Sequence, residues 1–384
     1  MPHDPYRALY VHIPFCVKRC GYCDFATAAI SRDDDRIDKY VENLVLDIRR
    51  LSKAGELAEV ETVYIGGGTP SHIGLSRLSS LLYALSVSMD LTRDDLEFTM
   101  EANPESLDER MVRDVWALGV NRLSIGVQSF DEKVLSTLGR AHDAERARRA
   151  VRSAFERFEN VSIDLMCGIP GQSEAVFEES LREAVELGVK HVSVYPLTIE
   201  PHTLFDQLVL AGEMKEPDDD VEAAHMEVAE SVLSECGFSR YEVASYALPG
   251  YESKHNSSYW TGIPYLGIGE SATTMTQNAE RRMRVTNGEV VDDLDRRQME
   301  AEDLMLGMRL SRGISDERLK EAEAYLPDAS SVMQSLVDDG YVEHSDYSWR
   351  PTKQGWLCGN DLYGRLLLGL LRLSNALALS ARGC

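Results

Sequence analysis

Residues 8–25 read ALYVHIPFCVKRCGYCDF. The first six residues form an apolar, partly β-branched run that is typical of a buried β-strand. Three cysteines, Cys16, Cys20 and Cys23, follow in the spacing C-x3-C-x2-C. Three thiolates this close in the chain can surround one metal centre, and soft sulfur ligands favour an iron–sulfur cluster or zinc. The sequence therefore predicts a metal-binding loop directly after its first strand.

The metal allows two interpretations. A structural zinc site would take His12 or Asp24 as its fourth ligand, but such sites more often contain paired C-x2-C units. Three cysteines without a nearby fourth fit better a 4Fe-4S cluster that leaves one iron open. Neither the zinc site nor the cluster is expected to use the remaining four cysteines, which are Cys167, Cys236, Cys358 and Cys384.

Strand-like runs recur along the first half of the chain. Five more lie near residues 60, 96, 122, 161 and 191, each followed by a segment of helical periodicity. After the first run, residues 36–51 place Ile37, Val41, Leu44 and Ile48 on one helical face. Six strand-then-helix units predict an α/β fold, a partial parallel (β/α)6 barrel, with chemistry at the C-terminal ends of its strands.

The pattern changes after residue 217. We expect the barrel over residues 1–217 and a linker or extension over 218–290. In the extension, a helix from Val221 to Glu235 leads to RYEVASYAL and then to a loop that runs to about residue 278. Residues 291–384 predict a smaller, mostly helical winged-helix-like domain, with a hairpin at GYVEHSDYSWRP. Because residues 316–346 are strongly acidic, this domain is not expected to bind DNA.

Charge and composition limit the classes of function. The 384 residues include 64 acidic and 40 basic side chains, a net charge of −24, which disfavours nucleic acid as a partner. An odd number of cysteines, seven, fits a reducing compartment better than a disulfide framework. The sequence shows neither a secretory signal nor an apolar run long enough to span a membrane. We therefore expect a folded, cytoplasmic protein.

The metal loop also carries a family resemblance. YVHIPFCVKRCGYCDF, residues 10–25, resembles the cluster loop of the radical S-adenosylmethionine (SAM) superfamily, and its flanks resemble the coproporphyrinogen dehydrogenase-related branch. The likeness extends from about Tyr6 to at least Leu371. It implies a 4Fe-4S cluster on Cys16, Cys20 and Cys23, with the amino and carboxylate groups of SAM on the open iron.

Five further motifs agree with this resemblance. GGGTP, EANP, GVQS, LGRAH and SIDL each lie at or near the end of a predicted strand or in the loop that follows. Taken singly, each polar residue is better explained as part of a salt bridge at the barrel mouth. Taken together, the motifs imply by family likeness that SAM is surrounded by Tyr10, Tyr22, Gly67, Gly68, Thr69, Glu101, Gln128, Arg140 and Asp164.

Two features divide the branch. The oxygen-independent coproporphyrinogen dehydrogenases carry a further cysteine at the position where this chain has Phe25. They also carry an additional N-terminal segment, whereas here fifteen residues precede Cys16. HNSSYW, residues 255–260, instead resembles the motif of haem chaperones of the HemW type, which implies that His255 holds haem. A single His in a polar loop is otherwise more often a hydrogen-bonding residue. After Gly269 the chain departs from this family's glycine-rich pattern with Glu270-Ser271-Ala272.

The leading hypothesis is a haem chaperone that binds haem, a 4Fe-4S cluster and SAM, and delivers haem to an acceptor protein. An electron donor protein and a dimer are compatible with this hypothesis. The first alternative is a radical SAM enzyme that oxidatively decarboxylates coproporphyrinogen III. The second is a zinc-stabilised barrel protein without radical chemistry.

Overall fold

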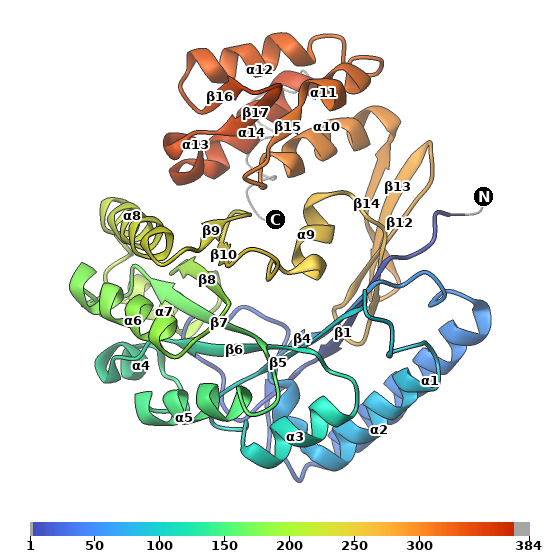
Figure 1. The fold of residues 1–384 in the computed structure, drawn as a ribbon, viewed down its shortest axis with the longest axis vertical. Helices are drawn as coiled ribbons and strands as arrows, with labels where there is room; N and C mark the ends of the chain where they lie inside the picture. Colours follow the sequence, from blue (N-terminus) through green and yellow to red (C-terminus); the bar gives the residue numbers. More distant parts are fainter. Residues whose placement is uncertain (1–2, 372–384) are drawn as a thin grey trace.

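A parallel sheet forms the centre of the molecule (Figure 1). The computed structural model describes residues 3–371, so Cys384 lies outside the described residues. Six parallel strands are hydrogen-bonded in chain order, namely β1 (Ala8–Ile13), β4 (Thr62–Gly67), β5 (Glu97–Ala102), β6 (Arg122–Gln128), β7 (Asn160–Cys167) and β8 (His191–Pro196). The predicted α/β fold and its six strands are confirmed.

Helices cover the outer face of this sheet (Figure 1). They are α1 (Asp35–Ala54), α2 (Leu75–Ser86), α3 (Glu109–Ala117), α4 (Glu132–Leu138), α5 (Ala144–Ala154) and α6 (Glu174–Glu186). The first helix begins at the end of the acidic run of residues 33–35, because the Asp34 side chain accepts a hydrogen bond from the Arg36 backbone N–H. It ends at Gly55, whose φ of 83° is readily adopted only by glycine.

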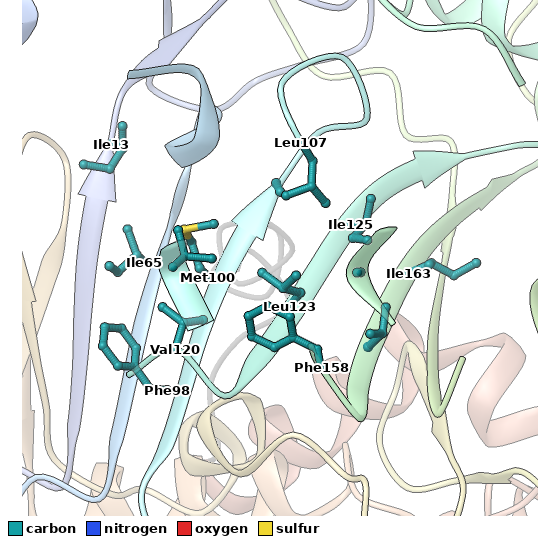
Figure 2. Close-up of a cluster of buried hydrophobic side chains, with 14 of the residues drawn as sticks. Ile13, Ile65, Phe98, Met100, Leu107, Val120, Leu123, Ile125, Phe158 and Ile163 are labelled. Carbon is teal, nitrogen blue, oxygen red and sulfur yellow. The ribbon is translucent and has the colours of Figure 1, made fainter. Parts of the chain in front are cut away.

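The strands alternate between an apolar outer face and a polar inner face. Outward side chains such as Ile65, Phe98 and Ile125 are fully buried, and Figure 2 shows them projecting from the strands. The inward positions of the same strands carry Tyr64, Glu101, Arg122, Ser124, Asp164 and Ser193. Because side chains on a strand alternate with a period of two, one face makes the core and the other makes a polar lumen.

Residues 218–290 extend the barrel sheet at both of its edges. After α8 (Asp219–Glu235), strand β10 (Ser245–Ala247) pairs antiparallel with β8, and β9 (Ser239–Arg240) pairs antiparallel with β10. After α9 (Lys254–Trp260), β11 (Tyr265–Ile268) pairs in parallel with β1. The antiparallel strands β12 (Thr273–Gln277), β13 (Arg281–Thr286) and β14 (Glu289–Asp295) follow.

The mostly loop structure expected for residues up to about 278 is therefore wrong. The expected helix from Val221 is present as α8, but the Gly-, Ser- and Asn-rich stretch after it forms α9, β11 and β12. The unpaired backbone groups at the edges of a sheet favour such pairing even where local propensity for strand is weak.

The C-terminal residues build a second hydrophobic core. Five helices surround a small sheet in the order β15 (Ile314–Ser315), β17 (Ser348–Pro351), β16 (Val342–Ser345). The helices are α10 (Arg296–Gly307), α11 (Asp316–Ala322), α12 (Ala329–Asp338), α13 (Lys353–Leu357) and α14 (Gly359–Leu371). The predicted hairpin is present as β16 and β17. Among residues 3–371, no helix combines the length and the apolar character needed to cross a membrane.

The turn after β11 keeps a left-handed backbone without a second glycine. Gly269 has a φ of 101° and Ser271 a φ of 61°, a conformation that side chains other than glycine rarely adopt. The Ser271 backbone N–H donates to the Asn287 side chain at 2.9 Å, and the Glu270 N–H donates to the Tyr40 hydroxyl at 2.9 Å. These bonds hold the turn in the part of the sequence that departs from the family pattern.

We expect Gly269→Ala to destabilise the protein by about 2 to 4 kcal/mol, because its φ is left-handed and a Cβ would lie 2.5 Å from the Tyr40 hydroxyl and 2.8 Å from the His12 carbonyl oxygen. Gly288→Ala is the matched control, since its φ of 82° is also left-handed but no atom lies within 4 Å of a Cβ there. Thermal melting measures both variants. Equal losses would contradict a steric role for the turn.

Candidate functional site

The cysteine loop is fixed at several points. Cys16 ends β2 (Phe15–Cys16), which pairs with β3 (Ala28–Ala29), and its carbonyl accepts the Ile30 N–H at 3.0 Å. Gly21 accepts a hydrogen bond from the backbone N–H of Phe205, at the start of α7 (Leu204–Leu210). A Cβ on Gly21 would lie 2.3 Å from the Phe205 ring, so only glycine allows this close approach.

Three thiols of this loop face one cavity of about 480 Å³. Burial is the main cause that raises the pKa of Cys16 to about 11, with smaller contributions from the neighbouring Cys20 and Cys23. The Thr69 hydroxyl lies 3.5 Å from the Cys16 sulfur, and Arg140 Nη1 lies 3.4 Å from the Cys20 sulfur. Three soft donors on one fixed loop beside a guanidinium fit an anionic metal–sulfur cluster.

The glycines of GGGTP allow the second loop to pack against the first. A Cβ on Gly68 would lie 2.8 Å from the Phe15 carbonyl oxygen and 2.9 Å from the Cys16 sulfur. The Gly67 N–H donates to Glu101 Oε2 at 3.0 Å, so this donor already has a protein partner. Thr69 is buried and accepts a hydrogen bond from the Asn103 amide at 2.8 Å. It positions the loop and does not line the cavity.

Two carboxylates occupy the middle of the lumen. Glu101 accepts hydrogen bonds from the Tyr64 hydroxyl at 2.7 Å and from Gly67. Burial raises its pKa to about 7, although these two bonds oppose the shift. Burial likewise raises the pKa of Asp164 to about 6, while the positive charge of Arg122 opposes that rise. Two carboxyl groups with raised pKa values in one cavity are characteristic of a ligand-binding site.

Gln128 and Arg140 complete the wall next to the cysteines. Gln128 ends β6 at a φ of 67°, a strained conformation for a residue other than glycine and one that clusters at functional sites. Arg140 Nη2 donates to Asn103 Oδ1 and to the Gly126 carbonyl oxygen, both at 2.7 Å. Arg140 is therefore held rigidly beside Cys20.

The structure brings most of the predicted site residues to the same cavity. Its lining includes Cys16, Cys20, Tyr22, Cys23, Gly67, Gly68, Glu101, Gln128, Arg140 and Asp164. Tyr10 and Thr69 are adjacent but do not line it, and Tyr10 bonds to His12 Nδ1 at 2.9 Å.

Sequence reasoning missed several lining residues, namely Tyr64, Asn103, Arg122, Ser124, Ser193 and Asn256. Most of them occupy inward positions of strands, so the alternation of polar and apolar residues contains the signal that identifies them.

His255 lies outside this lining, in α9. Its Nδ1 is 2.9 Å from the Thr62 hydroxyl and its Nε2 is 3.0 Å from the Tyr259 hydroxyl, and the imidazole stacks on the Tyr64 ring. It is 1% exposed, and burial lowers its pKa to about 3. The imidazole is therefore neutral, as iron ligation requires, but both nitrogens have a protein partner.

The raised pKa of Glu101 predicts a pH dependence of stability. The folded protein binds this proton more tightly than the unfolded chain, so the free energy of unfolding falls as pH rises from 4.5 to about 7, by at most about 3 kcal/mol. Glu101→Gln should remove the part of this fall in the free energy of unfolding that comes from Glu101. Glu59→Gln, a control at an exposed position, should not. Urea unfolding of the metal-free protein at pH 5 and pH 8 measures it. Parallel pH curves for both variants would rule out a raised pKa at Glu101.

Comparison with known proteins agrees with this geometry. The profile of the radical SAM superfamily matches residues 10–184, and that of the HemN C-terminal domain matches residues 294–358. Coproporphyrinogen III oxidase (HemN) from Escherichia coli has a similar fold, with a TM-score of 0.77 and 21% identity over 95% of this chain and 90% of that one.

Curated relatives match over nearly the full length. A protein of Bacillus subtilis is 34% identical over 94% of this chain and 99% of its own, and one of Escherichia coli is 36% identical over 93% and 97%. A Mycobacterium tuberculosis relative is 35% identical over 96% of both chains. Each is named heme chaperone HemW. The chain therefore belongs to the radical SAM superfamily and, within it, to the HemW family.

Proposed function

We propose that this protein is a haem chaperone that binds haem together with a 4Fe-4S cluster and SAM, and passes the haem to an acceptor protein. The observation that carries this proposal is the identity of 34–36% over nearly the whole chain to relatives that bear the name heme chaperone. The likeness to coproporphyrinogen III oxidase, at 21% identity, shows a shared fold and does not favour decarboxylation.

Cys16, Cys20 and Cys23 would hold the cluster, because all three thiols face one cavity from one fixed loop. Together with SAM the cluster supplies one-electron chemistry when bound, and its reduction requires an electron donor. The Gly67–Gly68 backbone brings the second loop against the Cys16 sulfur and so shapes the cluster end of the cavity.

SAM would occupy the cavity next to the cluster. Its positively charged sulfonium group is complementary to Glu101 and Asp164, whose carboxyl groups line the same cavity. Arg140 is fixed beside Cys20, where its charge suits the carboxylate of SAM. Gln128 and Tyr22 line the wall between these groups, while Tyr10 and Thr69 act from behind it.

Haem binding through His255 requires α9 to change. Imidazole is a good iron ligand, but Nε2 must first lose its contact with the Tyr259 hydroxyl. The proposed role of His255 thus includes a rearrangement that exposes Nε2, with the contact to Thr62 left to orient the ring through Nδ1.

We expect anaerobically purified protein to contain about four irons per chain and Cys20→Ala to lose most of them, because a 4Fe-4S cluster with an open iron cannot spare one of three protein ligands. Cys358→Ala is the matched control, since Cys358 is exposed in the C-terminal domain. Iron analysis and the visible absorption spectrum measure the outcome. Zinc alone in the wild-type protein, or unchanged iron in Cys20→Ala, would contradict the proposed cluster.

Haem titration tests His255 directly. His255→Ala should weaken the Soret band of bound haem, whereas Tyr259→Phe should tighten haem binding three- to tenfold, because it frees Nε2 from a hydrogen bond worth about 1 kcal/mol. Opposite effects of the two substitutions separate ligation from general destabilisation of α9. Haem affinity that neither substitution changes would place the iron ligand elsewhere.

A further inference from the structure

Arg122 is a buried positive charge that forms no direct ion pair with the residues 3–371 that the structure describes. It begins β6, its side chain faces the lumen, and only 1% of the residue is exposed. Among residues 3–371, no carboxylate oxygen lies within 4.0 Å of its guanidinium, and its Nε has no hydrogen-bond partner. Because buried charges are strongly unfavourable unless paired, a guanidinium that is left unpaired in a cavity wall marks an anion site.

The neighbours of Arg122 restrict the charge of that anion. Glu101 and Asp164 line the same cavity and are close enough for Arg122 to lower the pKa of each. They would repel a doubly charged phosphate, whereas a carboxylate carries one charge. Neutral groups that can donate hydrogen bonds are also present, since Ser124, Ser193 and Asn256 line the same cavity.

Arg122 is too far from the cysteine loop to serve the carboxylate of SAM. Arg140, which contacts Cys20, donates to the carbonyl oxygen of Gly126, four residues along β6 from Arg122, a backbone separation of about 13 Å. In the proposed function the SAM carboxylate lies at the cluster end, beside Arg140 and Cys20. An anion at Arg122 therefore belongs to a second ligand, bound deeper in the lumen.

We propose that Arg122 binds a carboxylate of this second ligand, with Ser124 and Asn256 as further hydrogen-bonding partners. A guanidinium can donate two parallel hydrogen bonds to a carboxylate, which fixes the direction of the group that carries it. A tetrapyrrole that carries a carboxylate on a short flexible side chain can supply this group. This choice of ligand rests on the proposed haem function, whereas the carboxylate site does not.

Propionate ion tests the site without haem. In saturation-transfer NMR with the cluster-loaded protein, we expect a propionate signal from wild type that Arg122→Gln abolishes and Arg122→Lys reduces. Arg50→Gln, a control on the exposed face of α1, should behave as wild type. Equal signals from wild type and Arg122→Gln would overturn the site. If Arg122→Gln does not fold, an undiminished signal from Arg122→Lys overturns it.

Haem and its dimethyl ester test the ligand. We expect wild type to bind haem at least tenfold more tightly than the ester and Arg122→Gln to bind both equally, because esterification and the substitution remove the two halves of one ion pair. Equal binding of both porphyrins by wild type would overturn the tetrapyrrole assignment. Wild type that gives the propionate signal but binds neither porphyrin would contradict the haem function and leave the carboxylate site standing.

Discussion

The polar lumen of the barrel is the constraint on which the rest of the structure depends. Strands that bury an apolar outer face beneath helices place their alternate residues inside the barrel, where polar groups are out of reach of bulk water. An unsatisfied buried polar group costs about 1 to 3 kcal/mol, so the lumen is stable only if its groups bond to each other or to a ligand. His191 illustrates the first solution, with Nδ1 at 2.7 Å from the Ser162 hydroxyl and Nε2 at 2.8 Å from the Tyr241 hydroxyl.

Helix α9 solves the same problem at the end of the lumen where strands β4 and β5 begin. The Glu97 carboxylate accepts backbone N–H groups of Lys254 at 2.8 Å and His255 at 3.0 Å, so it satisfies donors that a helix leaves free at its first turn. At the other end of α9, the Trp260 indole donates to Glu242 and the Arg309 guanidinium stacks on the Trp260 ring. The HNSSYW stretch therefore connects the inside of the barrel with the C-terminal domain, and in Figure 1 the helix lies between them.

The sequence predicts the parts of the structure whose cause is local. Six strands, the first helix and the cysteine loop follow from short patterns, and the structure reproduces them. Strands β11 and β12 do not, because β11 forms by pairing with the edge at β1 and β12 by pairing with β11, and nothing in their own residues specifies that edge. The burial of His255 is also non-local, since its partners Thr62 and Glu97 are 193 and 158 residues away in the chain. A motif can thus identify a residue while leaving its surroundings undetermined.

The charges along the cavity explain why some lumen groups remain unsatisfied. Positive Arg140 lies at the cysteine end and positive Arg122 at the far end, with the carboxyl groups of Glu101 and Asp164 between them. Burial raises the pKa of both carboxyl groups, which means that the ligand-free lumen stabilises neither as an anion. A ligand with a cation in the middle and a carboxylate near an arginine stabilises the charged forms of these groups. Each protein charge then has a ligand charge of opposite sign beside it. The same groups that reduce the stability of the folded chain consequently supply its affinity for charged ligands.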